Sequence, residues 1–476
     1  MTRRRTKRRH QRFGRLVLTA GLLALFGAAL LNPDWLGHLS ADGVLSLPLI
    51  QKVHAVCLSL LLASGILVTV GTHRHFGLLG CVIGVVAWLA CSLVIVDRIY
   101  PGHLLFRPKA LLGAVLGEEV LLRDYDPRSH LVVPSHVVRS ARYPAIGIHT
   151  HFRHGTHRTP DELVGIMQRC NLQAMVDLDG ELDGRLREEM RHYAATDADR
   201  FVIFATFWFS ADLDKWDHWR GIVDQLDEAK QLGARGIKVW KNLGLRTRDE
   251  RGRLIAIDDM RLEPLWMKAD ALGLPILIHV GDPAANFEPL DRYNERIEYL
   301  TADAAIAYQG LGAPRPQTLL AQFERVVERH PNVTFILAHL GNLSYDLAAA
   351  GQMLNRHPNL SMDISARANE LGRQPVTARA FFIRYADRLL FGTDGNPDDK
   401  VYRGYFRLLE TSDEYFDDPE WPEFKFGRWK LYGLNLPDDV LRKVYHDNAA
   451  KILSLPLLTS TQASKAESGR TTERVR

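Results

Sequence analysis

Short apolar runs alternate with helical patterns from about residue 144 to residue 455. Each run is brief and almost continuously apolar, which is typical of parallel strands that are covered on both faces. The eight runs are residues 144–152, 173–179, 201–207, 236–240, 275–280, 333–339, 360–365 and 388–394. Because eight strand–helix pairs in series favour a closed parallel sheet, we predict an α/β fold, a (β/α)8 TIM barrel over residues 144–455.

The helical patterns carry boundary signals of their own. Thr159 before Pro160 predicts a helix start, since Thr caps free N–H groups and Pro fits the first turn. Gly233 predicts the end of the helix that precedes the fourth strand. The alternative fold, an open doubly wound sheet, would carry a glycine-rich phosphate loop after its first strand, and the sequence has none there.

Three longer apolar segments precede the barrel, at residues 16–31, 53–71 and 76–96. A helix needs about 20 apolar residues to cross a bilayer, so we predict a membrane anchor of three transmembrane helices over residues 16–96. The first segment could instead be a signal peptide behind a basic arm. All three could also be buried helices of a soluble domain, but their clustering before Asp97 favours contact with the lipid bilayer.

Basic residues in the flanks set the predicted orientation. Residues 1–15 carry eight Lys or Arg and no acid, which predicts a cytoplasmic arm. Three crossings then place the barrel outside the cytoplasm, whereas two crossings leave it inside. We therefore expect a multi-pass protein of a bacterial-type inner (plasma) membrane with an extracytoplasmic barrel.

The remaining segments add little chemistry. Residues 97–143 read as a connector with one short helix and an extended run, and residues 456–476 as a disordered polar tail. The net charge is +4 for the whole chain and −4 without the eight basic residues of the N-terminal arm. No nucleic-acid partner is therefore expected. The four cysteines form neither a disulfide framework nor a metal-binding knuckle.

Potential metal ligands stand just past the predicted strands. Neutral imidazoles and carboxylates suit Zn²⁺ or another divalent first-row metal, and the C-terminal ends of barrel strands meet at one face. The residues concerned are His149, His151, Lys238, His279, His339 and Asp394. They predict a metal-dependent enzyme with one or two ions, most simply Zn²⁺, with Mn²⁺ as the other choice.

This pattern resembles the amidohydrolase superfamily, in particular its amidohydrolase-related branch, over about residues 145–455. The resemblance extends to the final helix, with DNAAKIL at 447–453. It implies that His149, His151, His279 and Asp394 are the ligands of the catalytic metal.

The resemblance also assigns the other two residues. His339 matches a histidine that binds a second metal in some members and contacts the substrate in others. Lys238 resembles a lysine that is carbamylated to bridge two metals, a role that Lys241 could hold instead. Family members usually carry an aspartate where this chain has Gly147, which predicts altered support behind the first two histidines.

The same residues have expected roles in catalysis. A divalent metal activates water at neutral pH, Asp394 would accept its proton, and His339 or a second metal would polarise the scissile carbonyl. Candidates for contact with a small-molecule substrate lie in the long loops. They are Arg153, Lys241, Asp282, Asn286 and Arg367.

The sequence therefore predicts a metal-dependent hydrolase acting on an amide or an ester or lactone carbonyl. A non-oxidative decarboxylase or hydratase uses the same fold and remains the alternative. A non-catalytic binding scaffold is the lesser alternative. The sequence leaves the oligomeric state open, a homo-oligomer included.

Overall fold

The computed structural model describes residues 128–152, 158–182, 184–207, 216–419, 426–459 and 472–475. The chain divides into two compact units, Met1–His130 and Leu131–Arg476. The predicted basic arm, the membrane segments and most of the connector lie outside the described residues. Within those that are described, no helix combines the length and apolarity needed to span a membrane.

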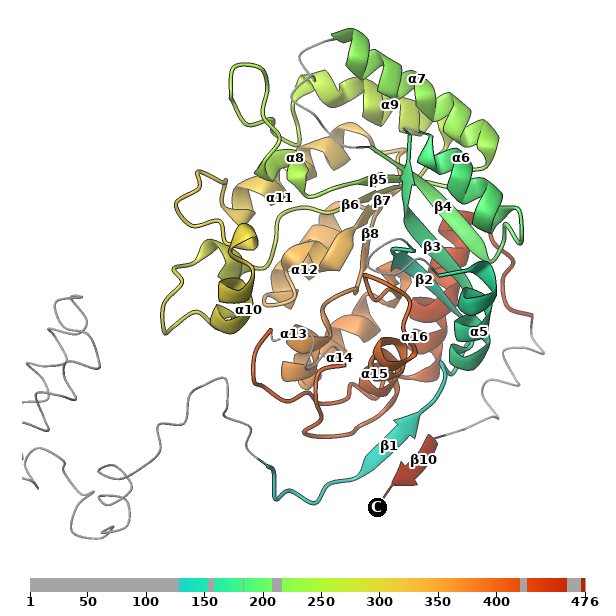
Figure 1. Ribbon diagram of the computed structural model, residues 1–476. Coiled ribbons are helices and arrows are strands. Elements are labelled where there is room, and N and C mark those ends of the chain that lie inside the picture. The colour runs from blue at the N-terminus through green and yellow to red at the C-terminus, as the bar shows by residue number, and fades with distance from the viewer. Residues whose placement is uncertain are drawn as a thin grey trace, which may run out of the picture. The chain divides into compact units, whose positions relative to one another are not determined.

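Eight parallel strands form one sheet in sequence order, which confirms the predicted TIM-barrel-like α/β fold (Figure 1). Backbone hydrogen bonds from Ile148 N to Phe391 O (2.9 Å) and from Asp394 N to His149 O (3.1 Å) tie the last strand to the first. The strands are β2 (Ala145–Thr150), β3 (Leu172–Glu181), β4 (Phe201–Thr206), β5 (Ile237–Val239), β6 (Ile276–Ile278), β7 (Phe335–Leu337), β8 (Leu360–Asp363) and β9 (Leu389–Leu390).

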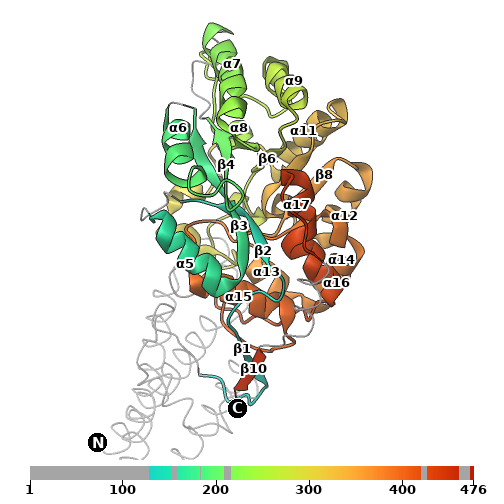
Figure 2. The same cartoon turned by 90° about the vertical axis from the view of Figure 1, so that its right-hand side faces the viewer.

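Helices cover the outside of the sheet (Figures 1 and 2). Thr159 caps the first of them as predicted, since its Oγ1 accepts from Glu162 N (3.3 Å) and Glu162 accepts from Thr159 N (2.7 Å). The helices are α5 (Pro160–Cys170), α6 (Arg185–Glu189), α7 (Trp216–Leu232), α8 (Asn242–Leu245), α9 (Glu263–Leu272), α10 (Ile297–Ala302), α11 (Pro316–Arg329), α12 (Leu347–Arg356), α13 (Ala368–Arg373), α14 (Pro375–Arg384), α15 (Asp399–Glu410), α16 (Asp438–Arg442) and α17 (Asn448–Leu453).

The interior of the barrel is apolar at the end where the strands begin. Ile146, Val202 and Leu277 point inward there, and Ala449 and Leu453 of α17 pack against the same cluster. The last helix therefore closes this end of the barrel. The opposite end, where the loops after the strands converge, is left for chemistry.

A small second sheet corrects the prediction for the tail. The strand β1 (Ser135–Val138) pairs antiparallel with β10 (Thr472–Val475). We predicted disorder for residues 456–476, and that prediction is wrong at these four positions. A strand of 4 residues shows no periodicity, and its partner lies at the other end of the unit, so nothing local in the sequence identifies it.

Candidate metal centre

Three of the predicted ligands meet at the open end of the barrel. Asp394, which follows β9, places Oδ1 at 3.5 Å from His149 Nε2 and at 3.3 Å from His151 Nε2. Donor atoms of these three residues all lie within 4.8 Å of one another, a spacing that could hold a metal ion. The last strand and the first therefore supply one cluster.

The other two histidines complete this cluster. The ring of His339 lies 4.8 Å from that of His149 and 4.3 Å from that of His279, centroid to centroid. His339 Nε2 is 3.7 Å from Asp394 Oδ2. Among the described residues, the buried Nε2 atoms of His279 and His339 have no hydrogen-bond partner. Since a buried polar atom without a partner is costly, these nitrogens fit metal ligands.

The protonation states also suit a cation. Burial lowers the pKa of His149 and His279, and it lowers the pKa of His339 to about 3, so these imidazoles are neutral at neutral pH. Although burial opposes it, the surrounding histidines hold the pKa of Asp394 well below its usual range. His151 differs, because hydrogen bonds to Asp179 and Asp394 outweigh its burial and raise its pKa to about 9.

Two carboxylates that sequence reasoning missed orient the first two histidines. His149 Nδ1 donates to Asp363 Oδ2 on β8 (2.9 Å), and His151 Nδ1 donates to Asp179 Oδ1 on β3 (2.7 Å). Each bond keeps a proton on Nδ1 and so directs Nε2 toward the metal position. Support that was expected at position 147, where this chain has glycine, thus comes from β3 and β8.

Lys238 lies inside the same cluster. Its side chain is fully buried, with Nζ at 3.4 Å from His149 Nε2 and at 5.1 Å from the centre of the Trp240 ring. Burial lowers its pKa to about 8. A lysine in this position can reach any ion that His149 binds.

Of the candidate substrate residues, Lys241 and Asp282 border the cluster and Asn286 does not. Lys241 Nζ donates to both oxygens of Asp282 at 2.9 Å, and Tyr308, which sequence reasoning missed, donates to Asp282 Oδ2 (2.5 Å). Asp282 Oδ1 is 3.8 Å from His279 Nε2, so this group borders the cluster. Asn286 instead donates to Ile306 O (3.0 Å) within its own loop.

One of the two predicted arginines lies within the described residues. Arg367 is buried and donates to Asn342 Oδ1 (2.7 Å), on the loop that also carries His339. Arg153 lies outside the described residues.

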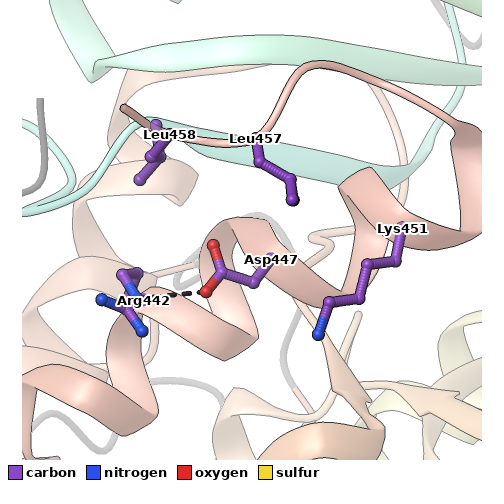
Figure 3. A pocket seen from close by; sticks show the side chains of 5 residues that line it. All are labelled: Arg442, Asp447, Lys451, Leu457 and Leu458. Carbon is purple, nitrogen blue, oxygen red and sulfur yellow. Dashed lines mark hydrogen bonds and ion pairs between the residues drawn. The ribbon is translucent and has the colours of Figure 1, made fainter. Parts of the chain in front are cut away.

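A cavity of about 220 Å³ lies elsewhere, against the C-terminal helices (Figure 3). Arg442, Asp447, Lys451, Leu457 and Leu458 line it, and Arg442 Nε donates to Asp447 Oδ2 at 3.0 Å. Asp447 also accepts from His446 Nδ1 at 3.1 Å. None of the predicted site residues lines this cavity, and its only carboxylate is already paired.

Solved structures similar to this chain include 2,6-dihydroxybenzoate decarboxylase complexed with 2,6-dihydroxybenzoate, at 16% identity and a TM-score of 0.42, covering 66% of this chain and 100% of that one. An amidohydrolase from Burkholderia multivorans with bound HEPES is 14% identical, with a TM-score of 0.41, and the match covers 66% of this chain and 100% of that one. The 4-oxalomesaconate hydratase from Rhodopseudomonas palustris is 15% identical, with a TM-score of 0.39, and the match covers 65% of this chain and 95% of that one. Such low identities and TM-scores carry no argument about the reaction.

A search of curated proteins gives no match. The family model described as "Amidohydrolase" matches residues 146–455, which is well over half of the chain and includes every residue of the metal-ligand cluster. The chain therefore belongs to the amidohydrolase family, whose members are metal-dependent enzymes.

Proposed function

We propose that the barrel is a metal-dependent hydrolase acting on an amide or an ester or lactone carbonyl. The observation that carries this proposal is the convergence of three imidazole Nε2 atoms on one ionised carboxylate at the open end of the barrel, with the ring of His279 against that of His339. His149, His151, His279 and Asp394 would hold the catalytic ion, Zn²⁺ or Mn²⁺. When bound, that ion would supply a Lewis acid and activate water at neutral pH.

Asp394 is suited to move the proton of the attacking water. Its carboxylate faces three histidines and stays ionised, so it can accept a proton near the reacting atoms and return it to the leaving group. The left-handed backbone at Asp394 (φ 67°) turns the side chain back toward the end of β2, where His149 and His151 lie. One residue would thus serve as ligand and as proton carrier.

The hydrogen bonding of His339 narrows its role. Its Nδ1 donates to Ser365 O (2.8 Å), which leaves a lone pair and no hydrogen on Nε2. With its pKa lowered to about 3, this imidazole does not gain a second proton at neutral pH. His339 is therefore suited to bind an ion or to accept a hydrogen bond, and not to donate a hydrogen bond to the scissile carbonyl, which was the role expected from the sequence.

Lys238 supports a second ion. A buried lysine whose pKa is about 8 is partly neutral at physiological pH, and the neutral amine is the form that reacts with carbon dioxide to give a carbamate. Carbamylation would turn a buried cation into an anion beside His149. That change favours two metal ions, which in turn favours hydrolysis over the decarboxylase and hydratase alternatives.

The alternative reaction class keeps one ion. In a decarboxylase or hydratase, the lone pair of His339 Nε2 would face the substrate and accept a hydrogen bond from it. The same neutral imidazole therefore supports both classes, and the number of ions per chain separates them.

Metal content is the first measurement. The full-length chain is purified in the presence of bicarbonate, and its metals are counted by mass spectrometry for the wild type and for Lys238→Ala. A matched control is Lys268→Ala, since Lys268 pairs with Asp227 on the surface (2.7 Å). We expect two ions in the wild type and in the control, and one in Lys238→Ala.

The outcomes separate the proposals. One ion in all three proteins would overturn the binuclear hydrolase and favour the decarboxylase or hydratase. No bound metal in any of them would overturn both. Release of ammonia or acid from a panel of amides and lactones, lost on chelation and restored by metal, would then establish the hydrolase.

We also propose that residues 16–96 anchor the enzyme in a membrane, with the barrel outside the cytoplasm. The three apolar segments and the eight basic residues of the N-terminal arm support this. A reporter fused after Arg476 that is active only outside the cytoplasm is the expected result. Activity of a reporter that works only inside would overturn the orientation.

A further inference from the structure

Two buried arginines share one carboxylate in the loops at the open end of the barrel. Arg296 follows β6 and Arg367 follows β8, and they are 2% and 5% exposed. Arg296 Nη2 donates directly to Glu370 Oε1. The nearest approach of Arg367 to the same carboxylate is 3.9 Å, from Nη1 to Oε2. Glu370 therefore pairs with Arg296, and the positive charge of Arg367 is compensated only in part.

The close partners of Arg367 are neutral. Its Nη2 donates to Asn342 Oδ1 (2.7 Å) and its Nη1 to the carbonyl oxygen of Ala366 (2.5 Å). Its buried Nε has no hydrogen-bond partner within the described part of the chain. A buried guanidinium held by neutral oxygens is costly, and an anion beside it would offset that cost.

This guanidinium belongs to the metal centre by position. Ser365, two residues earlier, accepts from His339 Nδ1 through its carbonyl oxygen (2.8 Å). Ala366 then adopts a left-handed backbone (φ 52°), which turns the chain sharply before Arg367. Asn342, the partner of Arg367, lies three residues after His339.

Lys241, another cation near the site, already has a partner. Its Nζ contacts both oxygens of Asp282 at 2.9 Å. On the side of the site formed by the loops after β7 and β8, the charge of Arg367 is compensated only in part, by Glu370 at 3.9 Å.

We propose that Arg367, oriented by Asn342, binds a carboxylate group of the substrate beside the metal centre. The substrate would then be an organic acid whose carboxylate is separate from the carbonyl that is attacked. The planar guanidinium suits this role because it can donate two parallel hydrogen bonds to one carboxylate. This inference rests on the proposed function, since it concerns the substrate of the same site.

The test compares acids with their neutral amides. Benzoate and benzamide, and acetate and acetamide, are titrated against the full-length chain in its metal-loaded and metal-free forms, and apparent affinities are taken from the rise in melting temperature with concentration. For the wild type we expect each acid to bind about tenfold tighter than its amide or better, with or without metal. In Arg367→Gln the two should bind about equally.

Two further variants guard against loss of folding. Arg373→Gln is the matched control, because Arg373 pairs with Glu295 nearer the surface (2.9 Å) and should leave the acid-to-amide ratio unchanged. Asn342→Asp keeps the size of the side chain and supplies a resident carboxylate to Arg367, so it should abolish the preference for acids while Arg367 remains in place. Near-ultraviolet circular dichroism reports whether each variant is folded.

The outcomes are decisive for the inference. An acid-to-amide ratio that is the same in wild type, Arg367→Gln and Asn342→Asp would overturn it. A preference for acids that disappears when metal is removed and is unaffected in Arg367→Gln would assign carboxylate binding to the ion, and would overturn it as well. Failure of the proposed function shows instead in the metal content, which is measured on the same samples.

Discussion

Replacing Asp363 by Asn should weaken metal binding while leaving the barrel folded. Asp363 Oδ2 accepts from His149 Nδ1 at 2.9 Å. Its Oδ1 accepts from the backbone N–H groups of His339 (2.9 Å) and Ser365 (3.0 Å), and from the Ser365 hydroxyl. One carboxylate thus orients one histidine and holds the loop of another.

The asparagine side chain cannot accept hydrogen bonds both from His149 and from the donors of the loop. Its single oxygen must stay with the backbone donors, so its NH₂ group would face His149 Nδ1, where a proton already sits. His149 then either moves its proton to Nε2 or turns its Nδ1–H toward the Ser365 hydroxyl oxygen alone, which lies 2.9 Å from Nδ1. A protonated Nε2 has no lone pair for a metal, and the ligand is lost or misoriented.

The size of the effect follows from this bond. Loss of a partner that orients a metal-binding histidine typically costs 10- to 100-fold in metal affinity, or about 1.4–2.7 kcal/mol. Replacing a charged acceptor by a neutral one in a buried network should also cost about 1–3 kcal/mol of folding free energy. The barrel buries a large apolar core, so we expect the variant to fold.

Competition with a chelator of known affinity measures the change directly. The matched control is Asp387→Asn, because Asp387 is mostly exposed and its partner is Lys443 (3.1 Å) on the surface. The control should bind metal as the wild type does. Equal metal affinity in Asp363→Asn and wild type, with both folded, would refute the claim that this carboxylate sets the tautomer of His149.

Three further predictions concern protons and the backbone. His151, whose pKa is raised to about 9, is protonated at pH 7.5 without metal. Metal uptake should therefore release about one proton, and metal affinity should rise about tenfold per pH unit until pH 9. Calorimetry in buffers of different ionisation enthalpy measures the proton release, and its absence would contradict this prediction. Burial raises the pKa of Glu410 from 4.5 to about 7, so between these pH values the folded chain holds a proton that the unfolded chain has lost. The free energy of unfolding should therefore fall by about 3 kcal/mol as pH rises from 4.5 through 7. Urea denaturation at pH 5 and pH 8 should show this loss in the wild type and not in Glu410→Gln, and identical losses in the two proteins would contradict it. Gly341→Ala should cost about 1–3 kcal/mol in denaturant unfolding, since φ is +63° there and the new Cβ would lie 2.6 Å from Leu337 Cδ2; an unchanged midpoint would show that the loop can relax.

The barrel could be predicted from sequence because its strands are covered on both faces. A parallel strand under a helix layer has apolar side chains on both faces, so it is recognised in the sequence as a short apolar run. All eight predicted runs are strands, in the predicted order. The predicted ends were less accurate. We predicted a strand over residues 333–339, whereas β7 spans Phe335–Leu337. His339 leaves the strand for a left-handed backbone (φ 58°), which is how its ring reaches the cluster, and that local strain has no signature in an apolar pattern.

The carboxylates behind the histidines mark the limit of sequence reasoning at the site. Asp177 and Asp179 are two residues apart on β3, so the alternation of a strand places both on one side, and either could support His151. The pairing of β2 with β3 shifts between Gly147 and Thr150, and that of β3 with β4 shifts between Asp177 and Gly180. Those shifts in register decide which of the two aspartates accepts from His151.

With that register, Asp179 accepts from His151 Nδ1 (2.7 Å), whereas Asp177 accepts from the backbone N–H of Phe152 (3.0 Å). Burial, together with the nearby charges of Asp179 and Glu189, raises the pKa of Asp177 well above its usual range. Two aspartates that look equivalent in the sequence thus have different partners. Strand register, which depends on pairing across the barrel, makes one of them the partner of a metal-binding histidine and the other an acid of the core whose pKa is raised.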